Sequence, residues 1–362
     1  MKRTAVVCAL CVFLQTLLSI SLEAQSNINN CKASVICFNN SQWYAVCVPP
    51  LPPGVSDCNG FDFTEYCVIP LYDCPPAPCP TCNGATAAQP INLATGDTYI
   101  QQSDVTLPGL GGGLNLTRTW NSMPTPDVSN YGMFGHEWSS TFEEQVFIGP
   151  DNMIKHLHGD GSLWTYGFAQ SWGPTGYTPV FWTAAPRNGG ATMTYYGPPY
   201  VAAPYWILTL KDGATRSFYG TPGNLSPNQT FYLSSISDRN GNTASLSYDS
   251  SHLLTTVTDA SGRHLYFSYG GVVVGGAIFS VVTSVTSDFG VSLSYQYDAS
   301  ANLVRVTKPD GTYVSFQYNS AGQLTSVTDS AGKILESHTY DILGRGLTST
   351  RAGGADSITV SY

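Results

Sequence analysis

The chain carries little charge, and its few basic residues are scattered. Asp, Glu, Lys and Arg make up 11% of the 362 residues, the net charge is -9 and the pI is about 4.9. A protein that binds free nucleic acid or an anionic membrane normally presents a basic patch, and Lys and Arg form no cluster in this sequence. We therefore expect no nucleic-acid partner. The low charge also argues against a coiled coil or a charged disordered chain.

Long hydrophobic runs are missing after the N-terminus. Lys2 and Arg3 precede an apolar run over residues 5–20, and small residues precede Gln25. This pattern is typical of a secretory signal peptide over residues 1–24, the alternative being an uncleaved anchor. The mature chain is then expected to have no stable membrane span, and to be secreted or held at the cell envelope or surface.

No cysteine follows Cys82. Cys8 and Cys11 lie in the signal, and the others fall in a Pro-rich segment over residues 25–82, which a small-residue linker (83–88) follows. An even number of cysteines in a short exported segment predicts a disulfide framework, with pairing left open. Cys79-Pro-Thr-Cys82 has redox spacing, but no βαβ pattern surrounds it, so a structural bridge is favoured over redox or zinc chemistry. The expected disulfide residues are Cys31, Cys37, Cys47, Cys58, Cys67, Cys74, Cys79 and Cys82.

Catalytic motifs are also lacking. There is no Gly-x-Ser-x-Gly elbow, and no Gly-Lys-Ser/Thr follows the glycine run near residue 111. His156 and His158 share a face of an expected strand and could bind a metal with His136 or Glu137, but we interpret them as surface histidines beside a turn. We interpret the adjacent Glu143-Glu144 pair as solvated strand charges. We therefore predict no catalytic residue, no metal, no cofactor and no enzymatic activity.

Glycine (36), proline (23) and tyrosine (22) are plentiful, and they are ordered in residues 206–362. An Asp-Gly or Asp-x-x-Gly turn recurs, followed seven or eight residues later by tyrosine, which Asp or Asn usually follows. Such turns need glycine at positive φ, and the next residues alternate apolar and polar, so the pattern predicts tandem β-hairpins. A following Leu-x-x-Val-Thr suggests a β-bulge, since Leu and Val would otherwise face opposite sides. The repeat positions are Gly241, Tyr248, Gly262, Tyr269, Gly290, Tyr297, Gly311, Tyr318, Gly332 and Tyr340.

A second ordered passage covers residues 89–166 and predicts further strands and turns. Within it, Pro90-x-Asn92-x-x-Thr95-Gly96 precedes Leu107-Pro108-Gly109, a Leu-x-Arg-x-Trp-Asn-Ser strand (116–122) and a Gly-x-x-Trp turn (135–138). This passage resembles the uncharacterised domain that precedes the repeats in Rhs/YD-repeat proteins. His136-Glu137 departs from the smaller residues usual there.

The repeats resemble the same family, and Tyr340-Asp341-x-x-Gly344-Arg345 fits its Y-D-x-x-G-R motif best. The resemblance implies an all-β fold, in which tandem hairpins form a curved or spiral antiparallel sheet after the small disulfide-rich segment. In bacterial toxins of this family the sheet forms a hollow shell around a toxic domain, and in animal relatives it serves adhesion.

Residues 167–205 interrupt the hairpins with an aromatic-rich insertion. Exposed aromatic faces stack on sugar rings, whereas core packing is the alternative role of such residues. The candidate ligand-binding residues are Trp164, Trp172, Tyr177, Trp182, Tyr195 and Tyr196.

These observations predict a non-catalytic scaffold at the cell surface that binds glycans or proteins. The alternative is the truncated front of a polymorphic toxin, whose partner is a continuing Rhs chain or toxin. Closed into a ring, roughly seven hairpins after residue 205 would leave an interior roughly 10 Å wide. A folded domain of about 100 residues needs over about 30 Å. We therefore expect that this segment alone encloses no folded cargo.

Overall fold

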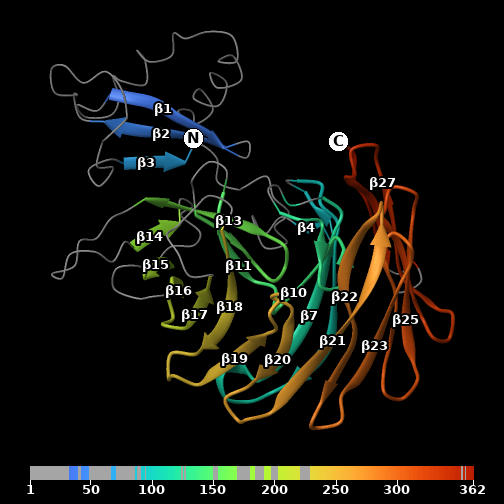
Figure 1. The fold of residues 1–362 in the computed structure, drawn as a ribbon. Helices are drawn as coiled ribbons and strands as arrows, with labels where there is room; N and C mark the ends of the chain where they lie inside the picture. Colours follow the sequence, from blue (N-terminus) through green and yellow to red (C-terminus); the bar gives the residue numbers. More distant parts are fainter. Residues whose placement is uncertain are drawn as a thin grey trace.

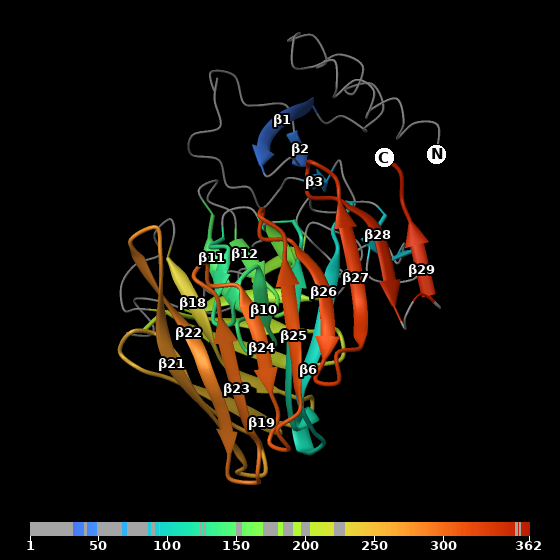
Figure 2. The same cartoon turned by 90° about the vertical axis from the view of Figure 1, so that its right-hand side faces the viewer.

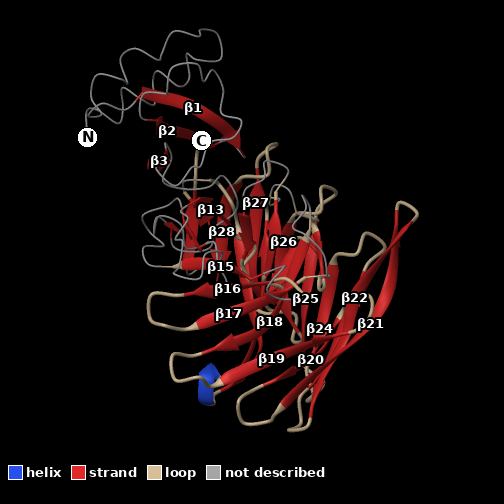
Figure 3. Cartoon of the chain, turned by 60° about the vertical axis from the view of Figure 1, so that its left-hand side comes forward, coloured by secondary structure: helices blue, strands red, loops and turns tan. Residues whose placement is uncertain are grey.

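The computed structural model consists almost entirely of β-strands (Figures 1 and 3). It describes residues 32–39, 42–48, 67–70, 86–87, 91–93, 95–123, 125, 128–149, 154–168, 180–183, 191–196, 203–220, 229–351, 354 and 356–362. A 19-stranded antiparallel sheet dominates, and smaller sheets come from the N-terminal part. The all-β expectation is confirmed. In the described part of the chain, no helix has the length and apolar character needed to span a bilayer.

The small sheets precede the large one in the chain. Their strands are β1 (Lys32–Asn39), β2 (Gln42–Val48), β3 (Cys67–Pro70), β4 (Thr86–Ala87), β5 (Ile91–Asn92), β6 (Tyr99–Leu107), β7 (Leu114–Asn121), β8 (Tyr131–Gly132), β9 (Gly135–His136) and β10 (Trp138–Ser140). A single 3-10 turn, η2 (Leu110–Gly112), joins β6 to β7.

The large sheet consists of consecutive strands. They are β11 (Gln145–Ile148), β12 (Ile154–Leu157), β13 (Leu163–Phe168), β14 (Val180–Thr183), β15 (Thr192–Tyr196), β16 (Tyr205–Thr209), β17 (Thr215–Tyr219), β18 (Thr230–Ser237), β19 (Thr243–Tyr248), β20 (Leu254–Thr258), β21 (His264–Val274), β22 (Ala277–Ser287), β23 (Ser292–Tyr297), β24 (Leu303–Thr307), β25 (Tyr313–Tyr318), β26 (Leu324–Asp329), β27 (Ile334–Tyr340), β28 (Gly346–Arg351) and β29 (Asp356–Thr359). The sheet thus runs through residues 167–205, where β14 and β15 lie.

The sheet starts with one closed revolution formed by β11 to β18, which we call the first turn, and then continues as a spiral. Each strand pairs with the next, and β11 also pairs with β18, where Val146 lies opposite Phe231. The first eight strands therefore meet at a seam. β18 is long enough to pair with β11 through residues 230–232 and with β19 through residues 235–237, so the sheet continues past the seam instead of ending there.

The repeat residues have a shared geometry. The five repeat glycines, Gly241, Gly262, Gly290, Gly311 and Gly332, all have positive φ in their turns. The tyrosine hydroxyl donates to the backbone of the preceding strand, as in Tyr248 to Leu233 O (2.6 Å), Tyr297 to Val282 O (2.8 Å) and Tyr318 to Leu303 O (2.8 Å).

The bulge suspected from Leu-x-x-Val is confirmed. Ser247 pairs with Thr256 but Tyr248 pairs with Leu254, so one residue is skipped, and the same shift recurs beside Tyr297, Tyr318 and Tyr340. The skipped residue turns Leu254 and Val257 to the same buried side. Strand alternation also agrees, because Leu293 and Tyr295 are buried while the serines beside them are exposed.

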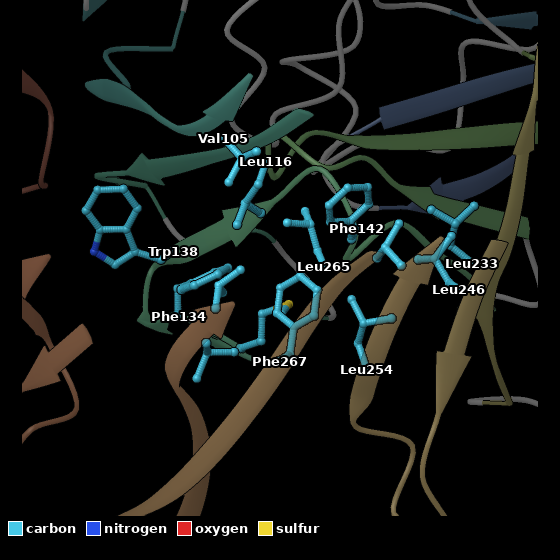
Figure 4. Packing of buried hydrophobic residues seen from close by; sticks show 14 of the residues in the cluster. Val105, Leu116, Phe134, Trp138, Phe142, Leu233, Leu246, Leu254, Leu265 and Phe267 are labelled. Atoms are coloured by element: carbon cyan, nitrogen blue, oxygen red, sulfur yellow. The ribbon is translucent and has the colours of Figure 1, made fainter. Parts of the chain in front are cut away.

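The N-terminal strands β6, β7 and β10 pack against the buried face of the large sheet (Figures 1 and 2). Figure 4 shows Phe134 beside Phe267 and Phe142 beside Leu265, both partners coming from β21. One continuous apolar cluster joins the two parts. The buried side of this spiral is therefore filled by the chain's own N-terminal part.

An ion pair lies within that contact. Arg118 of β7 is 1% exposed and binds both carboxylate oxygens of Asp104, at 2.5 and 2.8 Å. Tyr295 of the large sheet donates to the same carboxylate at 2.7 Å. The guanidinium also lies over the rings of Trp138 and Phe316, 4.8 and 5.8 Å from their centroids. The buried carboxylate of Asp104 in the N-terminal part thus receives one of its hydrogen bonds from the large sheet.

Backbone contacts bring the two parts close together. His136 N donates to Ala301 O (2.9 Å), Val282 N to Met133 O (2.7 Å) and Gly346 N to Gly96 O (2.8 Å). Where the two backbones come this close, there is no space between them for a side chain. At Gly135, with φ +93°, a β-carbon would lie 2.2 Å from Ala301 O.

We expect Gly135→Ala to lower the free energy of unfolding by roughly 3 kcal/mol, because it adds both backbone strain and a steric clash. Gly241→Ala is the matched control, since Gly241 has φ +84° but open space around it. It should cost only about 1 kcal/mol. Chemical denaturation measures both values, and equal losses would contradict the close docking at Gly135.

Candidate functional site

Buried polar side chains gather near the seam of the first turn. Glu144, directly before β11, is 6% exposed, and His156 of β12 is fully buried. Glu144 Oε2 lies 3.1 Å from His156 Nε2, and Glu144 Oε1 accepts a hydrogen bond from Arg216 Nε of β17 at 3.0 Å. The interpretation of these residues as surface histidines and solvated charges is wrong for Glu144 and His156. It failed because β12 is buried on both of its faces, so neither side of the strand is left in solvent.

His158, one position after β12, completes the cluster. Its ring centroid lies 4.0 Å from that of His156 and 4.0 Å from that of Trp164. Burial lowers the pKa of both His156 and His158 to about 3, so both imidazoles are neutral at physiological pH. His136 and Glu137, considered with them in the sequence, pair with each other at 3.8 Å instead.

A cavity of about 290 Å³ lies on one side of Glu143. Glu137, Trp138, Asn121 and Thr230 are among its lining residues. Burial raises the pKa of Glu137 to about 8, and burial raises the pKa of Glu143 to about 7 although Met133 N donates to it. A second cavity of about 300 Å³ also includes Glu143 but is lined largely by aromatic residues. These are Tyr131, Phe142, Tyr232, Tyr248, Tyr269 and Phe279.

A row of tyrosines crosses four strands next to this second cavity. Strand pairing places Tyr196, Tyr205, Tyr219 and Tyr232 directly opposite one another on β15 to β18. The ring of Tyr205 stacks on those of Tyr196 and Tyr219, with centroids 4.7 and 5.4 Å apart. Tyr219 is 50% exposed, and Tyr232 also lines the second cavity. We call these four residues the tyrosine row.

The candidate ligand-binding residues have different positions. Tyr196 belongs to the tyrosine row, whereas Tyr195 packs on buried Trp206 at 4.9 Å and Trp164 packs on His158. Trp182 is described only as backbone of β14, and Trp172 and Tyr177 lie outside the described residues.

Sequence reasoning missed Tyr205, Tyr219 and Tyr232. A signal was available, because each of β15 to β18 carries two adjacent aromatic residues. In a strand one member of such a pair faces inward and the other outward. It also missed Arg216, whose partner Glu144 lies 72 positions away. No local sequence pattern predicts the contact between Arg216 and Glu144.

Three predicted disulfide cysteines lie in described strands, and the backbone register places Cys47 opposite Cys67. Cys37 lies opposite Tyr44. The others, Cys31, Cys58, Cys74, Cys79 and Cys82, fall outside the described residues, so the disulfide framework stays a prediction.

The fold defines a class of protein in which tandem β-hairpins spiral around an N-terminal β domain. Family models identify its members: DUF6531, a domain of unknown function, matches residues 88–166, and the RHS Repeat matches 233–264, 302–334 and 318–356. The chain therefore contains a DUF6531 domain followed by RHS repeats, which confirms the resemblance seen in the sequence. No curated protein matches this chain.

Several solved structures are similar. The TcdB2-TccC3-Cdc42 structure shares 14% identity over 68% of this chain and 16% of its own, with a TM-score of 0.36. The N-terminal domain of the effector SpvB from Salmonella typhimurium strain LT2 shares 12% over 63% of this chain and 98% of its own, with a TM-score of 0.34. The Tc holotoxin pore of Photorhabdus luminescens shares 14% over 67% and 16%, with a TM-score of 0.38. The chain thus spans about a sixth of the length of the two toxin chains that it matches.

The raised pKa of Glu143 predicts a pH dependence of stability. A carboxyl whose pKa rises on folding contributes stability that is complete below its unfolded pKa of about 4.3 and is lost as the pH rises through its folded pKa. Between about pH 5 and pH 8, wild type should lose roughly 2 kcal/mol more unfolding free energy than Glu143→Gln, which keeps the acceptor for Met133 N.

Urea denaturation at each pH measures this difference. Asp212→Asn, at an exposed turn residue, is the control and should follow wild type. If Glu143→Gln shows the same loss as wild type, Glu143 does not hold its proton in the folded state.

Proposed function

We propose that this chain forms the front section of the wall of an Rhs-type toxin shell, and that its DUF6531 domain closes the first turn of the spiral. The observation that carries the proposal is the filled first turn. β11 closes against β18, and the domain's Trp120, Phe134 and Trp138 pack into the buried face. A wall built this way is sealed at its start.

Beyond the seam, the repeats support extension of the wall. Each hairpin contacts mainly its neighbours, as in other repeat architectures, so units can be added without altering earlier ones. The bond from tyrosine to the preceding strand continues through Tyr340 to Leu324 O (2.6 Å) and Tyr362 to Gly346 O (2.9 Å). A continuing Rhs chain is the partner we propose.

The native protein tests this function. An antibody against residues 89–166 should recover, from the source cells, a polypeptide much larger than the 38.8 kDa of this chain. Limited proteolysis should leave the Rhs part and an enclosed segment intact, because the closed wall excludes the protease. Denaturing the sample before proteolysis is the control and should abolish the protection. A native species of 38.8 kDa or less would contradict the shell.

A second function, binding of cell-surface glycans, is favoured by one observation. The tyrosine row presents stacked rings across four neighbouring strands and leads to the aromatic cavity through Tyr232. Flat aromatic faces of this kind can stack on sugar rings, and the carboxyl group of Glu143 in the cavity can form hydrogen bonds with sugar hydroxyls. This function requires only an accessible outer surface and is compatible with a shell.

We expect Tyr219→Ala to weaken glycan binding by roughly tenfold, because it removes the most exposed ring of the row. Glycan arrays identify the ligand, and calorimetry measures its affinity. Tyr266→Ala is the matched control, because Tyr266 is 41% exposed but lies on β21, outside the row. The proposal fails if no glycan binds wild type, or if both variants bind equally well.

A further inference from the structure

Three side chains with metal-binding atoms converge at the seam of the first turn. Glu144, His156 and His158 each offer one ligand atom, and these atoms all lie within 4.8 Å of one another. The β-sheet register explains the convergence. Val146 pairs with His156, and continuing this ladder outward places residue 144 opposite residue 158. His156 and His158 lie two apart, so they share a face.

The cluster contains buried polar atoms that the described side chains do not satisfy. His156 Nδ1 and His158 Nε2 are buried, and neither has a hydrogen-bond partner among the described residues. Leaving such a buried polar atom unsatisfied costs about 1–3 kcal/mol. By contrast, His156 Nε2 lies 3.1 Å from Glu144 Oε2, so the two side chains are already aligned. A cation between the three residues would give His158 Nε2 a partner and would bridge the aligned His156 Nε2 and Glu144 Oε2.

The chemistry of the three donors selects the kind of cation. Two neutral imidazoles and one carboxylate suit Zn²⁺ and related transition ions, whereas Mg²⁺ and Ca²⁺ prefer oxygen ligands. Arg216 donates to Glu144 Oε1 and so orients the carboxylate while leaving Oε2 available.

We propose that Glu144, His156 and His158 bind a divalent transition-metal ion of the zinc type. Zn²⁺ binds nitrogen at about 2.0–2.1 Å, so small side-chain rotations are needed to bring the three donors into a common coordination shell. The site goes beyond the proposed shell function. Glu144 also accepts a backbone hydrogen bond from Leu233 of β18 at 3.3 Å, so the ion would fasten β11 and β12 at the seam where the first turn closes.

Cobalt and zinc titration tests the site. The purified protein is stripped with a chelator and titrated with Co²⁺, whose visible absorption reports coordination by protein ligands. We expect one ion per chain, displacement by Zn²⁺, and a rise in the unfolding temperature with Zn²⁺ but not with Mg²⁺. His158→Gln should weaken Co²⁺ binding by about 100-fold or more and abolish the zinc-dependent stabilisation.

His264→Gln is the matched control, because His264 lies at the surface, 2.9 Å from Asp288, and should keep full binding. If His158→Gln does not fold, Glu144→Gln serves as the second variant, since it keeps an oxygen that accepts from Arg216. Absence of a Co²⁺ spectrum in wild type would overturn the site. Equal binding by wild type and either folded cluster variant would also overturn it.

Discussion

The arrangement of the whole molecule depends on the buried ion pair between Arg118 and Asp104. Arg118 is 1% exposed, and a buried guanidinium without a partner is strongly unfavourable. Both charges come from the N-terminal domain, but Tyr295 of the large sheet donates the third hydrogen bond to Asp104. Separating the two parts would therefore expose a large apolar surface and also remove the hydrogen bond of Tyr295 from the buried ion pair. The hydrogen bond from Tyr295 therefore fixes the position of the N-terminal domain on the large sheet, and the apolar contact stabilises it.

The repeat hairpins extend the curved sheet, and each hairpin produces its own part of the curvature. Each repeat skips one residue beside its tyrosine, and such bulges bend and twist a strand. The tyrosine hydroxyl then ties its strand end to the preceding strand. Curvature is thus built locally, whereas the N-terminal domain supplies the apolar surface that covers the buried face.

The seam between β11 and β18 is where structure and proposed chemistry meet. The buried cluster of Glu144, His156 and His158 lies beside it, Glu143 contributes to cavities of about 290 and 300 Å³, and the tyrosine row ends on β18. A metal at the seam would stabilise the closed first turn, and the outer tyrosines would remain available to a ligand. The proposed glycan-binding and metal-binding sites are neighbours at this seam, because Glu144 of the metal cluster also lines the aromatic cavity.

The amino-acid sequence by itself determined the class of fold, the repeat turns and the bulge. These features follow from the backbone freedom of glycine, the alternation of strand residues and the Leu-x-x-Val spacing, which are all local. Only the tertiary structure decided that His156 and Glu144 are buried, that Arg216 reaches Glu144, and that one tyrosine from each of four strands forms a row. Those outcomes depend on how far the sheet curves before β11 meets β18, and that closure joins residues about 85 positions apart, a separation over which no local pattern specifies contact.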